Sequence, residues 1–169
     1  MINTLQELKR RSIALGLCDR YKGEWDSCTT PRELYDMATD INGLEYLCDA
    51  TTFGWGGPFD CNYIKERFSD FVNGAYKRDK DGYTTALYCA YEGLVTARDT
   101  VVCLLDCKGS VIVPPNEFVT IMVGAGSDVY IANMGRINEL VVFGDAKVRG
   151  ARKAEKRTLI QESRWRKDS

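Results

Sequence analysis

Residues 120–131 read Thr-Ile-Met-Val-Gly-Ala-Gly-Ser-Asp-Val-Tyr-Ile, an apolar run, a glycine turn and a second short apolar run. The same plan occurs at residues 87–96, 102–113 and 140–149. One glycine of each segment lies at Gly93, Gly109, Gly126 or Gly144, so the spacing between segments is nearly constant. Such a period is typical of stacked β-solenoid coils, because each coil buries its face on the next and glycine permits the corner. The repeat therefore predicts a β-solenoid-like stack.

A second fold fits the same repeat. Strands spaced about eight to nine residues apart and joined by hairpins at the glycines would form an antiparallel sandwich. A weak six-residue phase of aliphatic residues favours the solenoid, but Glu117 and Gly135 interrupt that phase. The sequence alone leaves both arrangements open.

The first half of the chain carries three helix-start signals of one kind, in which Thr4, Thr30 or Asn42 precedes a glutamate by three residues. The polar side chain can accept from first-turn amides, and the carboxylate can reach back to the cap. These boxes predict helices near residues 5–17, 31–39 and 43–51. An apolar stripe predicts a fourth helix near 62–73, which ends at Asn73 and Gly74.

These patterns predict an α+β protein with a helical domain at residues 1–78, a repetitive β domain at 83–150 and a basic tail at 151–169. Residues 1–146 carry 14 Lys and Arg against 21 Asp and Glu, a net charge of −7. Residues 147–169 carry 9 against 3, a net charge of +6. Because the β pattern stops at residue 150, the tail is expected to form a short basic helix or an arm.

The basic tail is a candidate binding surface. Its cations could neutralise phosphates, dock on an acidic protein surface, or remain solvated at a frayed terminus. The body of the protein is acidic, so a protein partner such as a second copy of the chain is favoured over nucleic acid. The candidates are Arg149, Arg152, Lys153, Lys156, Arg157, Arg164, Trp165, Arg166 and Lys167.

Residues 53–59, Phe-Gly-Trp-Gly-Gly-Pro-Phe, place three aromatic rings on a glycine-rich loop between two predicted helices. Exposed rings at Phe53, Trp55 and Phe59 would form a recognition surface, since aromatic residues dominate binding hot spots. The rings could equally fill the seam between the two halves of the protein. Combined with the guanidinium groups of Arg136 and Arg149, the loop is also a candidate nucleotide site.

The chain contains no histidine. This absence excludes nucleophiles activated by histidine and removes the commonest zinc ligand. Cys103 and Cys107 have the spacing of a zinc-binding pair, but they lie on an apolar run whose alternate residues would enter the core. The glycines of residues 123–129 lack the third glycine and the following helix of a dinucleotide fingerprint. We therefore expect no catalytic residue, metal or cofactor, and an enzyme independent of histidine is a minor alternative.

Several short strings in the first half suggest a relationship. They are Leu8-Lys-Arg-Arg-Ser-Ile-Ala-Leu-Gly-Leu-Cys18, Trp25, Gly54-Trp55-Gly56, Tyr63-Ile64 and Asp81-Gly82-Tyr83-Thr84. This combination resembles a group of small uncharacterised proteins encoded by phages and prophages of gut bacteria. The resemblance covers most of residues 1–95 and includes no catalytic motif. It implies a mobile-element context and supplies no functional residues.

The sequence thus predicts a non-catalytic phage or prophage protein that works as a homo-oligomer, as a virion component or an assembly factor. Under this hypothesis, deleting residues 151–169 disrupts assembly. The alternative function is an anti-defence protein that captures a host factor or a signalling nucleotide. Seven irregularly spaced cysteines and a charged N-terminal segment favour the host cytosol, with no membrane association.

Overall fold

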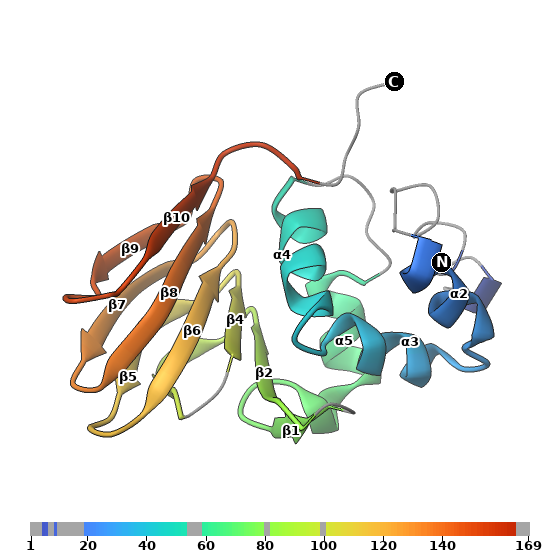
Figure 1. Ribbon diagram of the computed structural model, residues 1–169, viewed down its shortest axis with the longest axis horizontal. Coiled ribbons are helices and arrows are strands. Elements are labelled where there is room, and N and C mark those ends of the chain that lie inside the picture. The colour runs from blue at the N-terminus through green and yellow to red at the C-terminus, as the bar shows by residue number, and fades with distance from the viewer. Residues whose placement is uncertain are drawn as a thin grey trace.

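The computed structural model describes residues 5, 6, 9, 19–53, 59–79, 82–98 and 101–164. Figure 1 shows three layers: the helices, a six-stranded sheet (sheet A) beside them, and a four-stranded sheet (sheet B) on the far side. The two sheets are the opposite walls of a β-solenoid of about four turns. The predicted α+β class and the solenoid-like stack are therefore confirmed.

The helical layer contains α2 (Asp19–Ser27), α3 (Pro31–Ala38), α4 (Gly43–Phe53) and the shorter helix α5 (Cys61–Arg67). The predictions near residues 31–39 and 43–51 are confirmed as α3 and α4. Helix α2 was not predicted, because its sequence offers neither an apolar stripe nor one of the capping boxes. The helix predicted near residues 5–17 falls mostly outside the described residues.

The helix caps differ in detail from the predicted boxes. At α3, Thr30 Oγ1 accepts from the Glu33 amide at 3.2 Å, as predicted. At α4, the cap is Asp40 and not Asn42: Asp40 Oδ1 accepts from the amide of Gly43 at 2.6 Å. The Asn42 box was therefore the wrong local interpretation of a correctly predicted helix.

Helix α5 is shorter than the predicted helix near 62–73. It ends at Arg67 and is followed by the 3-10 turn η1 (Ser69–Phe71), so Asn73 and Gly74 do not cap it. Asn73 instead binds the main chain of the first coil: its Oδ1 accepts from the Cys89 amide at 2.8 Å and its Nδ2 donates to the Cys89 carbonyl at 3.3 Å. A tertiary contact thus decides the conformation of this segment.

The strands alternate between the two sheets along the chain. Sheet A contains β1 (Tyr76–Arg78), β2 (Thr84–Cys89), β4 (Val101–Leu105), β6 (Phe118–Val123), β8 (Arg136–Phe143) and β10 (Arg157–Ile160). Sheet B contains β3 (Glu92–Thr96), β5 (Lys108–Val113), β7 (Asp128–Asn133) and β9 (Lys147–Gly150). Apart from the antiparallel β1–β2 pair, the described pairings are parallel. The antiparallel sandwich alternative is therefore wrong.

The coil length is less regular than the glycine spacing suggested. Gly93 pairs with Gly109 across β3 and β5, whereas Gly109 pairs with Val129 and not with Gly126, and Val129 pairs with Val148. The first of these coils is therefore shorter than the two that follow. Gly126 and Gly144 lie instead in the turns before β7 and β9. The glycines thus occupy two different places in the coil.

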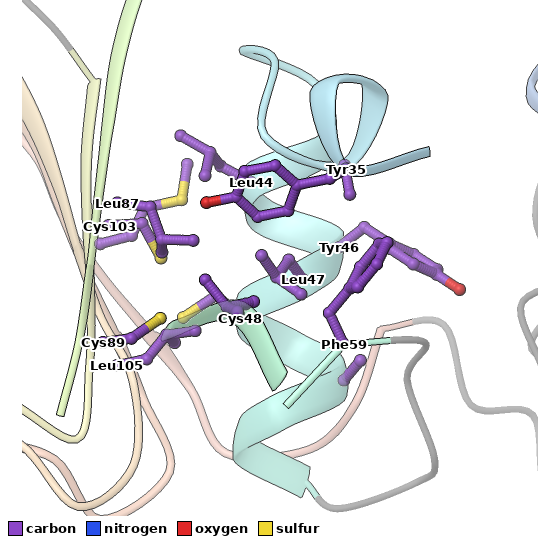
Figure 2. Packing of buried hydrophobic residues seen from close by; sticks show 14 of the residues in the cluster. Tyr35, Leu44, Tyr46, Leu47, Cys48, Phe59, Leu87, Cys89, Cys103 and Leu105 are labelled. Carbon is purple, nitrogen blue, oxygen red and sulfur yellow. The ribbon is translucent and has the colours of Figure 1, made fainter. Parts of the chain in front are cut away.

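The central strands of sheet A are buried on both faces over much of their length, which explains their continuous apolar runs. One face carries Leu87, Cys103 and Leu105 against the helices, as Figure 2 shows. The other face carries Leu104 and Ile121 into the solenoid interior. Two apolar clusters result, one between helices and sheet A and one between the two sheets. No helix in the described part of the chain is long and apolar enough to cross a lipid bilayer.

The segment after residue 150 continues the solenoid. Strand β10 pairs in parallel with β8, with Leu159 opposite Val142 and Ile160 opposite Phe143. The expectation of a basic helix or arm is therefore wrong for residues 157–160. The error arose because a single four-residue strand, Arg-Thr-Leu-Ile, has no period-two alternation and follows a run of charged residues, so it carries little local pattern.

Candidate functional site

The predicted aromatic loop does not form an exposed recognition surface at the rings that can be placed. Phe59 is 2% exposed and meets Tyr35 edge to face, with ring centroids 5.8 Å apart. Phe53, the last residue of α4, is half-buried against the same helical cluster. Trp55 lies outside the described residues. The structure thus corrects the assignment of Phe59, which fills the core and is inaccessible to a partner.

Several predicted basic residues are paired with acidic residues of the same chain. The Arg136 guanidinium lies 2.5 Å from a Glu155 oxygen, and Arg149 lies 3.5 Å from Asp128. Lys156 pairs with Glu139 at 3.6 Å, and Arg164 pairs with Glu45 of α4 at 2.5 Å. These contacts neutralise much of the charge that made the C-terminal segment look like a docking surface.

The other tail candidates have three different environments. Arg157 donates to the carbonyl oxygens of Gly150 and Ala151 at 3.1 and 2.9 Å, so its guanidinium closes a turn of the solenoid. Arg152 and Lys153 lie exposed in the turn after β9, without an ion pair among the described residues. Trp165, Arg166 and Lys167 lie outside the described residues.

The nucleotide site predicted from Arg136, Arg149 and the aromatic loop is not assembled. Arg136 belongs to β8 in sheet A, and Arg149 belongs to β9 in sheet B. The two guanidinium groups therefore project from opposite walls of the solenoid, and each already binds a carboxylate. This combination of residues cannot hold one small ligand.

The C-terminal segment joins the solenoid to the helices. Figure 1 shows the chain leaving β10 and crossing to α4. There the buried carboxylate of Asp49 accepts from Ser163 Oγ at 2.5 Å and from the Arg164 amide at 2.9 Å. Deleting residues 151–169 would remove β10 and leave Asp49 without these donors. Loss of assembly after that deletion would therefore report a damaged fold, and a different test is required.

No described element covers the outer face of sheet B (Figure 1). Val129 and Ile131 point into the interior, so their neighbours Asp128 and Tyr130 point outward. Tyr130 is 47% exposed, and Leu94, two strands away, is 54% exposed. Leu94 and Tyr130 thus add exposed apolar area to this open face, with Ser110 between them in the strand register.

Four charged residues form one row across this face, which we call the charge ladder. The strand register places Glu92 opposite Lys108, Lys108 opposite Asp128, and Asp128 opposite Lys147. The sign therefore alternates along the stack of coils. Asp128 pairs with Arg149, whereas Glu92, Lys108 and Lys147 make no ion pair with the described residues.

The charge ladder was missed in the sequence because its members are unevenly spaced along the chain. Each one opens the second strand of a coil, at β3, β5, β7 or β9. The coils between them differ in length, and the glycines of the repeat do not lie at a constant distance from these residues along the chain. The sequence nevertheless contains one signal: each of these four strands begins with a charged residue, and the sign of the charge alternates from one strand to the next.

The two cysteines considered as a zinc pair lie on different sides of sheet A. Cys103 belongs to the cluster beneath the helices, and Cys107 belongs to the solenoid interior, where its Sγ lies 3.4 Å from the Tyr88 carbonyl oxygen. They cannot ligate one ion. Among the described residues, no group of three or more acidic or cysteine side chains has a metal-binding arrangement.

Cys61 is the most reactive thiol expected among the six described cysteines, all of which are free. A hydrogen bond from the Cys89 thiol lowers the pKa of Cys61, whereas its role as donor and its burial raise the pKa of Cys89. A lower pKa means more thiolate at neutral pH, and thiolate is the reacting species. Cys61 is also half-buried, while the other five are buried.

We therefore predict that iodoacetamide at pH 7 alkylates Cys61 faster than the other described cysteines, as measured by peptide mass spectrometry. Cys89→Ala removes the donor, so it should raise the pKa of Cys61 and slow its alkylation. Cys89→Ser retains a donor and is expected to preserve the rate. Equal rates in both variants would contradict the role of Cys89.

The helices cover sheet A and leave sheet B open, so the protein is a helix-covered β-solenoid with one open wall. No family model, curated protein or solved structure matches this chain.

Proposed function

We propose that this chain is a non-catalytic phage or prophage protein that binds a second copy of itself through the outer face of sheet B, as a virion component or an assembly factor. The phage context rests on the resemblance of residues 1–95 alone. Self-association rests on one observation, the symmetry of the charge ladder. Its signs in coil order are negative, positive, negative, positive.

Such a row is complementary to its own reverse. A two-fold axis that lies in the interface and runs along the strands brings the row against a reversed copy. Glu92 then faces Lys147 of the other copy, and Lys108 faces Asp128. An axis along the stack of coils would bring each charge of the row against its own equivalent. The charges thus select one dimer, in which the two solenoids run in opposite directions.

The expected dimer is weak. Neighbouring strands are about 4.8 Å apart and residues along a strand about 3.3 Å apart, so the face measures roughly 20 Å by 20 Å. It would bury about 400 Å² per copy, against about 800 Å² in a standard interface. Exposed ion pairs add about 0.2–1 kcal/mol each and are screened by salt. We therefore expect a concentration-dependent dimer that dissociates at high salt.

Charge reversal provides the test by sedimentation velocity at low salt. Glu92→Lys turns two attractive contacts per dimer into repulsive ones and should raise the dissociation constant about tenfold or more. The double variant E92K/K147E restores opposite charges across the interface and should return the constant to near the original value.

Folding stability separates this proposal from a purely internal role of the charge ladder. Within one chain, E92K creates one pair of like charges on adjacent strands, and E92K/K147E creates two. The free energy of unfolding measured in urea should therefore be highest for the original chain, lower for E92K and lowest for the double variant. Dimerisation should instead be recovered in the double variant. A chain that stays monomeric at millimolar concentration, or a double variant as defective as E92K, would refute the proposal.

A further inference from the structure

A cleft of about 430 Å³ lies on the opposite wall of the solenoid, where the strands of sheet A begin. Its lining comes from the β1–β2 hairpin, from the starts of β2, β4, β6 and β8, and from the connection between α3 and α4. The lining includes Ile41, Arg78, Tyr83, Phe118, Thr120 and Asn138. This cleft is separate from the proposed dimer face, which belongs to sheet B.

Two aromatic rings of the cleft remain accessible. Tyr83 is 54% exposed and Phe118 is 42% exposed, although other aromatic residues such as Tyr35 and Phe59 are buried in the helical layer. The guanidinium carbon of Arg136 lies 4.9 Å from the centroid of the Phe118 ring and supports it from one side. Exposed rings in a concave site are suited to stacking against a flat ligand.

The cleft has one unpaired positive charge. Arg78, the last residue of β1, is exposed and has no ion pair or side-chain hydrogen bond with the described residues. Two cations elsewhere in the fold are paired instead, since Lys77 binds Asp36 at 3.3 Å and Arg32 binds Asp70 at 2.7 Å. No carboxylate is among the described lining residues, in a protein whose first 146 residues are acidic overall. Arg78 is the charged residue among the described lining residues, and a guanidinium binds an anion.

The two sides of the cleft are held in place by Asp79. Its Oδ2 accepts from the Ile41 amide at 3.2 Å, and its Oδ1 accepts from the Tyr83 amide at 2.9 Å. These bonds fix the hairpin that carries Tyr83 against the helical layer. On the floor, Asn138 Nδ2 donates to Thr120 Oγ1 at 3.4 Å, a long bond that leaves the amide oxygen available to accept.

We propose that this cleft binds a small ligand that combines a planar heteroaromatic ring with an anionic group, the chemistry of a nucleoside monophosphate. Phe118 and Tyr83 stack on the ring, Asn138 accepts a hydrogen bond from the ring edge, and Arg78 binds the phosphate. A nucleotide fits better than a free phosphate because a single guanidinium supplies few contacts by itself. A nucleotide also fits better than a neutral ring, because a neutral ring has no anionic group for Arg78 to bind.

The test is isothermal titration of the full chain with AMP, GMP, CMP and UMP, and with the nucleoside and inorganic phosphate that correspond to the tightest of them. We expect that nucleotide to bind at least tenfold more tightly than either fragment. Arg78→Ala should lower its affinity about tenfold, to that of the nucleoside. Phe118→Ala should weaken nucleotide and nucleoside alike.

Two matched controls make the result specific. Arg67→Ala removes the same charge from α5, outside the cleft, and should leave the affinity unchanged. E92K/K147E alters the other wall of the solenoid and should also bind normally. The proposal is overturned if none of the four nucleotides binds at millimolar concentration. It is equally overturned if Arg78→Ala has no more effect than Arg67→Ala.

Discussion

Gly109→Ala is expected to prevent stable folding of the solenoid at 25 °C. Gly109 lies in β5 with φ +134, a conformation that L side chains rarely adopt. A Cβ at this position would also overlap the backbone carbonyl of Gly93, which lies directly beside it in the preceding coil. Since backbone atoms of a neighbouring coil cannot move aside, we expect the loss to exceed about 4 kcal/mol, a large part of the stability of a typical domain.

Gly93→Ala is the matched control for this prediction. Gly93 has nearly the same backbone conformation, with φ +137, but it lies in the first coil of sheet B. The nearest atom to an added Cβ would be the Tyr91 hydroxyl oxygen at 3.5 Å, an ordinary contact. Backbone strain alone should cost about 1–3 kcal/mol. Urea unfolding followed by circular dichroism measures both variants, and equal losses would contradict the role assigned to the preceding coil.

Phe143→Ala is expected to lower the free energy of unfolding by about 3–5 kcal/mol, the usual cost of removing a buried aromatic ring. Phe143 ends β8, is fully buried and belongs to the cluster between sheet A and the helices. The lost ring would leave a cavity between the two layers. Because this cluster joins helices and solenoid, unfolding monitored by tryptophan fluorescence and by circular dichroism should shift together.

Leu159→Ala is the control for the core prediction. Leu159 lies in the neighbouring strand β10 but is 69% exposed, so its truncation should change the stability by no more than about 0.5 kcal/mol. A shift of one spectroscopic transition without the other in Phe143→Ala would show that the two layers unfold independently. A loss as small as that of Leu159→Ala would contradict the assigned packing.

The candidate surfaces were harder to predict than the fold. The sequence indicated basic residues as binding candidates, yet Arg136 pairs with Glu155 and Lys156 with Glu139, in each case between neighbouring coils of the stack. The exposed rings of Tyr83 and Phe118 belong to turns and strand starts that carry no binding motif. Their importance depends on the cleft, and the cleft exists because the β1–β2 hairpin is held against the helical layer.

Much of the local structure could be predicted from the sequence: apolar runs long enough for strands, turns at Gly126 and Gly144, and the polar cap of α3. The sequence also determined the α+β class, since helical signals stop where the repeat begins. The choice between parallel coils and antiparallel hairpins was made by tertiary structure, because both satisfy the same spacing. Tertiary structure likewise brought Glu92, Lys108, Asp128 and Lys147 into one row. Coil lengths differ, and the packing of the solenoid interior sets the register between coils.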